Sequence, residues 1–137
     1  MKILMFYVRE FWWKPYAQVL EGAPAASPKE GKVEEAVVVF YHVEAEDPAR
    51  EKKIVEKLVK NIKWLARKFG TKRVILHSFN HLSESKASPE EGLALVERAK
   101  QKLLNGGFEI YETPFGWLNE WKMHVAGESL AKVFKAL

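Results

Sequence analysis

The sequence predicts an α/β fold in which a mixed β-sheet of about five strands is covered by three helices. Runs rich in β-branched and aromatic residues recur along the chain, and two long segments with apolar residues at helical spacing lie between them. Such an alternation is typical of a sheet covered by helices. The 137 residues, of which 47% are apolar and 29% charged, suffice for one domain with one core. We therefore expect a single domain over residues 1–137.

Two strands are expected in the first third of the chain. Residues 2–9 form a nearly continuous apolar run, which suits a strand buried on both faces. An aromatic cluster follows at residues 11–16, and core packing or a subunit interface is favoured for it over stacking on nucleobases. Residues 21–31, with their prolines, glycines and small residues, are expected to form a loop. Residues 35–44 are rich in Val, Phe and Tyr and indicate the second strand.

Residues 47–69 are expected to form the first helix. Asp47 suits its N-cap, Pro48 its first helical position, and Gly70 the left-handed residue that ends it. Apolar residues recur there at spacings of three and four and make one stripe, which consists of Ile54, Leu58, Ile62, Leu65 and Phe69. Lys and Arg residues lie mostly off this stripe. Contact with RNA phosphates is one interpretation of them, but an ordinary solvated face is favoured.

The rest of the chain continues the alternation of strands and helices. Residues 73–77 indicate the third strand, and residues 88–104 a second helix that opens on a Ser-Pro-Glu-Glu capping box. Residues 108–112 are expected as the fourth strand. Residues 117–125, with every second side chain on one face, are expected as the fifth. A last helix is expected over residues 128–137, and its apolar pattern leaves open whether the chain is part of a longer protein.

Composition narrows the classes of protein to which the chain can belong. The absence of Cys excludes disulfides and thiolate zinc sites. No run approaches the roughly 20 apolar residues that span a bilayer, and the first residues lack the basic region and cleavage site of a signal peptide. We therefore expect a cytoplasmic location and no membrane partner. The net charge of +4 permits an RNA partner through phosphate neutralisation but does not require one.

A polar segment directly after the third expected strand is the first candidate site. It contains His77 and His81, four residues apart, together with Ser78 and Ser83. A metal site is disfavoured because the segment leaves a strand and has no obvious acidic or Cys partner. A catalytic serine is also disfavoured, since no glycines flank either Ser. Hydrogen bonding to a small polar ligand suits such a segment better.

The turn at residues 113–117 is the second candidate site. Its Pro and Gly make a rigid bend, and the Gly permits close approach of a ligand to the backbone. From the pattern alone, a plain turn between two strands is favoured. The residues considered so far predict an α/β domain with a polar pocket, but they do not define a reaction.

Several segments together resemble the editing domain at the N-terminus of archaeal threonyl-tRNA synthetases. Residues 31–44 resemble the second strand of that family, and residues 78–83 its Pro-Phe-Ala-His-Leu-Ser loop. Residues 106–108 and 113–116 resemble its Arg-Gly-Phe and Ala-Pro-Phe-Gly motifs. No single motif is specific, but the combination of His-Leu-Ser with Pro-Phe-Gly at this separation is fairly specific.

The resemblance implies a fold similar to D-aminoacyl-tRNA deacylases, a homodimer, and hydrolysis of serine wrongly attached to threonine tRNA. Serine and threonine differ by one methyl group, which binding discriminates by only about 1–3 kcal/mol, so a second site removes the error. The implied partners are the aminoacylated 3′ end of tRNA(Thr) and a synthetase catalytic domain, in cis or in trans. No metal and no cofactor are implied.

The resemblance also assigns site residues. His81 and Asn119 are expected to orient the amino acid or the attacking water, and so to be the catalytic pair. The expected substrate-binding residues are Val43, Glu44, Phe79, Asn80, Phe115, Gly116, Trp117, Leu118 and Lys132. This chain departs from the family at several of them: it has Asn80 for Ala, Leu118 and Asn119 for Tyr and Lys, and Lys132 for Glu. An RNA-assisted mechanism, in which the 2′-hydroxyl of the terminal adenosine assists the water, tolerates these losses.

Three alternative functions remain open at this point. The first is a dedicated D-aminoacyl-tRNA deacylase, although the chain lacks the Ser-Gln-Phe-Thr and Gly-Pro-Val-Thr motifs of those enzymes. The second is a non-catalytic module that only binds the tRNA acceptor end, which the loss of the family Lys and Glu favours. The third is a structural dimerisation domain, which the aromatic cluster favours.

Overall fold

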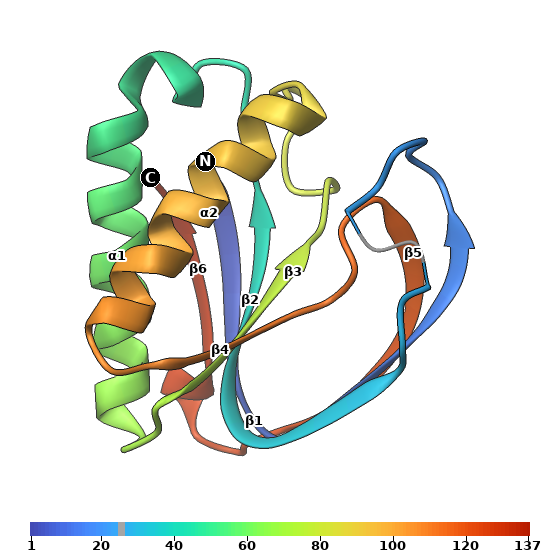
Figure 1. Ribbon diagram of the computed structural model, residues 1–137. Coiled ribbons are helices and arrows are strands. Elements are labelled where there is room, and N and C mark those ends of the chain that lie inside the picture. Colours follow the sequence, from blue (N-terminus) through green and yellow to red (C-terminus); the bar gives the residue numbers. More distant parts are fainter. Residues whose placement is uncertain (25–26) are drawn as a thin grey trace.

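The structure, a computed structural model, describes residues 1–24 and 27–137. Within these residues a six-stranded mixed sheet has the order β4-β3-β2-β1-β5, and β6 also pairs with β1. Figure 1 shows both α-helices against one face of this sheet. The strands are β1 (Lys2–Gln18), β2 (Gly31–His42), β3 (Arg73–Ser78), β4 (Glu109–Glu112), β5 (Trp117–Val125) and β6 (Lys132–Ala136). The helices are α1 (Glu51–Lys68) and α2 (Pro89–Asn105), with 3₁₀ turns at Asp47–Arg50 and Ser129–Ala131.

β1 is an inner strand that pairs with three other strands, and it is longer than the sequence predicted. It pairs antiparallel with β2 along most of its length, with β6 in its first part and with β5 in its second. The aromatic cluster therefore lies within the strand, where Phe11 and Trp13 are buried, so the expectation of core packing is confirmed for these two residues. β2 begins at Gly31, opposite Trp13, rather than at residue 35. Residues 25–26 of the expected loop lie outside the described residues.

The two expected αβ crossovers are confirmed. β2, β3 and β4 run parallel to one another, with α1 and α2 as the connections. The capping box of α2 is present: the Ser88 hydroxyl oxygen accepts a hydrogen bond from the Glu91 amide at 3.2 Å. The predicted N-cap role of Asp47 is wrong, because α1 begins at Glu51 and the Asp47 carboxylate is buried beside the Met1 amino group at 2.8 Å. That charge pairing uses the carboxylate that the cap would have needed.

The expected C-terminal helix over residues 128–137 is also wrong. A short 3₁₀ turn leads there into β6, which pairs antiparallel with Lys2–Phe6 of β1. Val133 and Leu137 pack against the core, and their spacing of four fits a strand as well as a helix. Without β6, the first part of β1 would expose a row of unpaired amides and carbonyls. This long-range pairing therefore decides the local structure.

Apolar side chains cover both faces of the sheet. Residues that alternate along β1, β2 and β3, such as Met5, Val39 and Leu76, pack beneath the two helices. Their neighbours of opposite parity, such as Val38 and Ile75, join Phe11 and Trp13 in a second cluster on the face away from the helices. The α/β class with a mixed sheet is thus confirmed, with two α-helices instead of three in the described part of the chain. No helix in the described part of the chain is long and apolar enough to cross a membrane.

Candidate functional site

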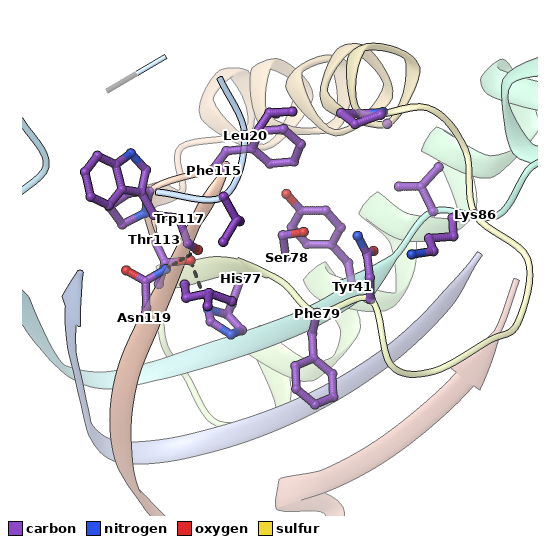
Figure 2. A pocket seen from close by; sticks show the side chains of 18 of the residues that line it. Leu20, Tyr41, His77, Ser78, Phe79, Lys86, Thr113, Phe115, Trp117 and Asn119 are labelled. Atoms are coloured by element: carbon purple, nitrogen blue, oxygen red, sulfur yellow. Dashed lines mark hydrogen bonds between the residues drawn. The ribbon is translucent and has the colours of Figure 1, made fainter. Parts of the chain in front are cut away.

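A pocket of about 530 Å³ lies at the carboxyl ends of β2 and β3, where ligands of such sheets commonly bind. Figure 2 shows residues of β2, β3 and the start of β5 around it, with the residues after β1 closing one side. Its lining consists of Val19, Leu20, Tyr41, Val43, His77, Ser78, Phe79, Asn80, His81, Lys86, Ala87, Ser88, Pro89, Gly92, Thr113, Pro114, Phe115, Gly116, Trp117, Leu118, Asn119 and Trp121.

The segment from β3 to α2 forms one wall and is held by β2. The buried His42 receives a hydrogen bond from the Leu82 amide on Nδ1 at 3.2 Å, and its Nε2 lies 2.6 Å from the Ser85 carbonyl. This pair of contacts requires the tautomer with hydrogen on Nε2, which donates to that carbonyl. The Ala87 amide donates to the Val43 carbonyl at 3.0 Å. The wall is therefore fixed at both ends of the segment.

Glu44 holds the same segment from outside the pocket. Its carboxylate accepts hydrogen bonds from the Met1 amino group, from Lys2 and, at 2.7 Å, from the Ser83 hydroxyl. Partial burial raises the pKa of Glu44, but these three donors outweigh it and lower the pKa to about 2. Glu44 is thus ionised at neutral pH, and it ties the chain after β3 to the start of β1.

The turn before β5 forms the opposite wall. Gly116 adopts φ +81°, and its carbonyl accepts hydrogen bonds from the amides of Val19 at 2.9 Å and Leu20 at 3.1 Å. A Cβ at Gly116 would stand 2.9 Å from the Ala23 Cβ and 3.0 Å from the Leu20 Cβ. Only glycine fits this position without a shift, and it brings the residues after β1 against the pocket.

A buried polar pair joins the end of β3 to this turn. His77 Nδ1 lies 2.9 Å from the Thr113 hydroxyl. The ring of His77 packs against Phe40, with 4.7 Å between the ring centroids. Burial lowers the pKa of His77 to about 4, so its imidazole is neutral at neutral pH. Burial likewise raises the pKa of the Tyr41 hydroxyl above its ordinary value.

Asn119 carries an unpaired polar atom at the base of this wall. Its Nδ2 donates to the Trp117 carbonyl at 3.1 Å, whereas its Oδ1 is buried with no partner among the described residues. A buried carbonyl oxygen without a donor costs free energy. Such an atom is suited to accept a hydrogen bond from a bound ligand.

The structure brings nine of the eleven residues expected from the sequence to this one pocket. They are Val43, Phe79, Asn80, His81, Phe115, Gly116, Trp117, Leu118 and Asn119. Glu44 and Lys132 do not line it. The Lys132 ammonium instead donates to the Ala126 carbonyl at 3.0 Å, near the start of β6. No contact in the pocket supports the substrate-binding roles that were expected for Glu44 and Lys132.

Thirteen of the described lining residues were not among the expected set, and four of them with polar side chains are Tyr41, Ser78, Lys86 and Thr113. Ser78 and Thr113 lie inside the motifs that the sequence singled out, so their position in the chain was a usable signal. Lys86 and Tyr41 carried no such signal. Their place follows from the parallel pairing of β2 with β3 and from the path of the segment before α2.

The pocket is lined by few charged side chains. Among the described residues that line it there is no Asp and no Glu, and Lys86 is the one Lys or Arg residue. Within residues 1–24 and 27–137, no three His, Asp or Glu side chains gather closely enough to hold a metal ion. The pocket can therefore offer neutral hydrogen-bonding groups, backbone dipoles and one ammonium.

Comparison with known proteins identifies the chain. Over residues 1–137 it matches the family described as the Archaea-specific editing domain of threonyl-tRNA synthetase. The chain belongs to this family. The editing domain is 32% identical to a threonine–tRNA ligase of Hyperthermus butylicus, over 97% of the chain and 22% of that protein. It is 34% identical to a threonine–tRNA ligase of Staphylothermus marinus, over 100% of the chain and 22% of that protein. It thus spans about a fifth of the length of these relatives.

A solved structure with the same fold supports the architecture of the editing domain. The protein named c-Myc DNA Unwinding Element Binding Protein superposes with a TM-score of 0.71, over 100% of this chain and 99% of that one. The two sequences are 11% identical, so the match shows a common fold and nothing further. The D-aminoacyl-tRNA deacylase-like fold class expected from the sequence is confirmed.

Proposed function

We propose that this editing domain hydrolyses the ester that joins serine to threonine tRNA. One observation carries the proposal beyond family membership: nine residues expected for that reaction surround a single pocket. Its volume of about 530 Å³ lies within the range that holds a ligand of drug-like size, such as an aminoacylated nucleoside. The need for the reaction is physical, since one methyl group is worth only about 1–3 kcal/mol in binding and a synthetase cannot exclude serine on that basis.

The proposed reaction is a simple ester hydrolysis. A water molecule attacks the carbonyl carbon of the seryl ester, and a tetrahedral oxyanion forms. The bond from that carbon to the ribose oxygen then breaks, the ribose oxygen takes up a proton, and serine and the free 3′ end are released. His81 and Asn119 lie in the pocket, where they can orient the amino acid or the water.

The absence of carboxylates from the pocket lining favours assistance from the RNA itself. A general base must lie within hydrogen-bond reach of the water and be able to take its proton. The described residues of the lining offer no carboxylate for this task, the neutral His77 is occupied on Nδ1 by Thr113, and His81 is assigned to orientation rather than to proton transfer. We therefore assign assistance of the water to the 2′-hydroxyl beside the ester. The domain supplies position and pre-oriented dipoles, which are large contributions to catalysis.

Deacylation assays test this function. The protein is incubated with seryl-tRNA(Thr) and threonyl-tRNA(Thr), and ester loss is followed against a control without protein. We expect selective loss of serine. Loss of D-aminoacyl esters with no loss of the seryl ester would instead establish a D-aminoacyl-tRNA deacylase. Saturable tRNA binding with no hydrolysis would establish a non-catalytic binding module.

The role of the RNA hydroxyl is tested separately. Seryl-tRNA(Thr) whose terminal adenosine lacks the 2′-hydroxyl keeps the same ester and the same shape. We expect its hydrolysis by the protein to fall to near the rate of the control without protein. Hydrolysis at an unchanged rate would assign the water to a protein group, and the proposed mechanism would be wrong while the editing function stood.

Substitution tests the two residues assigned to orientation. We expect His81→Ala and Asn119→Ala each to lower kcat/KM for the seryl ester. His124→Ala is the matched control for His81, since both imidazoles are exposed and His124, on β5, does not line the pocket. Full activity in both pocket variants would remove the assignment.

Two partners follow from the same proposal. A synthetase catalytic domain, attached in cis or bound in trans, would deliver the mischarged tRNA. A second copy of the chain would cover the sheet face away from the helices, where Trp121 is 38% exposed and Phe134 is 53% exposed. Light scattering of the purified chain decides this point, and a monomer at micromolar concentration would contradict the homodimer.

A further inference from the structure

Lys86 is the one Lys or Arg among the described residues that line the pocket, and the proposed reaction gives it no role. It lines the pocket with its side chain exposed, and the lining contains no Asp or Glu to neutralise it. In the described part of the chain, its ammonium lies within 4 Å of no carboxylate. Lys86 is therefore available to an anionic group of a ligand.

The backbone on both sides of Lys86 is held firmly. The Ser85 carbonyl receives a hydrogen bond from His42, and the Ser85 hydroxyl accepts one from the Ala45 amide at 3.0 Å. On the other side the Ala87 amide donates to the Val43 carbonyl at 3.0 Å. Lys86 thus extends from a fixed point of the wall. Figure 2 shows it on the side of the pocket opposite Trp117 and Asn119.

We propose that the Lys86 ammonium binds the phosphodiester group that precedes the terminal adenosine of the RNA, and thereby positions the ester in the pocket. This inference rests on the proposed function. The ligand would then carry two charged groups, a phosphate and the α-amino group of the amino acid. The ammonium attracts the first and repels the second when it is protonated. This Coulomb interaction favours one direction of the ligand, with the amino acid toward Trp117 and Asn119 and the phosphate toward Lys86.

Lys86 is accordingly a positioning residue. A phosphate contact binds the ground state and the transition state alike, so its loss raises KM and leaves kcat nearly unchanged. Formation of this phosphate contact also releases a counterion from the RNA. Loss of one such contact reduces the magnitude of the slope of log K against log salt concentration by about 0.7 for a single strand.

Two small substrates isolate the contact. One is 3′-O-seryl-adenosine, and the other is the same compound with a 5′-phosphate. We expect Lys86→Gln to lower kcat/KM for the phosphorylated substrate by about tenfold, as suits one charge-assisted hydrogen bond, and to leave the nucleoside ester unaffected. Lys86→Arg should retain most of the preference for the phosphate. Lys53→Gln, which removes a charge from the exposed face of α1, is the matched control and should change kcat/KM for neither substrate.

The outcomes separate this inference from the proposed function. Equal effects of Lys86→Gln on both substrates, a fall in kcat at constant KM, or no effect at all would each overturn the phosphate contact. If the unaltered domain hydrolyses neither small substrate, the salt dependence of tRNA binding decides: an unchanged slope in Lys86→Gln overturns the inference, and a slope lowered by about 0.7 supports it. Failure of the unaltered domain on seryl-tRNA(Thr) itself would count against the proposed function alone.

Discussion

The side chains of His77 and Thr113 are joined through Nδ1 and Oγ1 at 2.9 Å, in a buried contact between the end of β3 and the turn before β5. Both residues line the pocket, and both are at least 94% buried, with exposures of 5% and 6%. The contact connects the two walls of the pocket directly. Whatever disturbs the imidazole is therefore expected to disturb both the stability of the fold and the shape of the site.

Stability should fall as the pH is lowered through the range in which His77 titrates. Burial lowers the pKa of His77 from 6.5 to about 4, so between these values the unfolded chain binds a proton that the folded chain does not. The contribution is complete above about pH 6.5 and is lost as the pH falls to about 4; it is worth about 3 kcal/mol at most. Urea unfolding at pH 7 and pH 5 measures it. We expect His77→Gln to flatten this dependence, whereas His124→Gln, at an exposed position, should keep it.

Substitution of Gly116 tests how tightly the turn fits against the residues after β1. An alanine there must adopt φ +81° and place its Cβ 2.9 Å from that of Ala23. Gly107→Ala is the matched control, because its φ is +86° and no atom lies within 4 Å of the added Cβ. Both variants should lose about 1–2 kcal/mol of stability from the backbone conformation. Only Gly116→Ala should also lower kcat/KM for the seryl ester, and equal kinetics of the two variants would contradict the fit.

Protonation of Glu44 should lower the stability of the fold over a lower pH range than protonation of His77 does. Although burial raises its pKa, the hydrogen bonds from Met1, Lys2 and Ser83 lower it to about 2. A carboxylate with a lowered pKa stabilises the fold above its ordinary pKa near 4.5, and this stability is lost as the pH falls toward 2. We expect Glu44→Gln to cost about 1–3 kcal/mol at pH 7 and clearly less at pH 3. An equal cost at both pH values, measured by urea unfolding, would show that the charge of Glu44 is not what matters.

Local patterns in the sequence predicted the parts of the fold that local interactions determine. The stripe of α1 and the capping box of α2 are local patterns that indicate those helices without reference to distant partners. β1 and β6 depend instead on partners far along the chain. The aromatic cluster is a strand because Phe11 and Trp13 pair with Val33 and Gly31. The segment after the last 3₁₀ turn is a strand because Lys2–Phe6 offers it an edge.

The same distinction explains which parts of the site the sequence predicted. Phe79, His81 and Phe115 lie in compact motifs, so their common place at the strand ends could be expected. Leu20 reaches the pocket only because β1 runs on beyond residue 9, and Lys86 only because His42 and Val43 hold the segment around it. Neither relationship produces a periodic pattern of residues in the sequence. Lys132 was expected by position in the family pattern, but the strand β6 carries it away from the pocket.

Asn119 should separate function from stability more clearly than any other residue of the site. Its Oδ1 is buried without a partner, while its Nδ2 donates to the Trp117 carbonyl. Replacement by alanine removes one hydrogen bond and one unsatisfied acceptor together, so the free energy of unfolding should change by less than about 1 kcal/mol. If the unpaired oxygen serves the ligand, kcat/KM for the seryl ester should nevertheless fall by about tenfold or more.

Asn61→Ala provides the comparison for Asn119→Ala. The Asn61 amide also donates to a backbone carbonyl, that of Lys57 at 2.8 Å, but it lies on α1 and does not line the pocket. Asn61→Ala should change the free energy of unfolding by a similar small amount and leave kcat/KM for the seryl ester unchanged. A non-hydrolysable seryl-adenosine analogue should raise the melting temperature of the unaltered domain and of Asn61→Ala, and raise that of Asn119→Ala much less. Equal shifts in all three proteins would mean that the unpaired oxygen accepts nothing from the ligand, because a buried acceptor that gains a donor on binding must contribute to affinity.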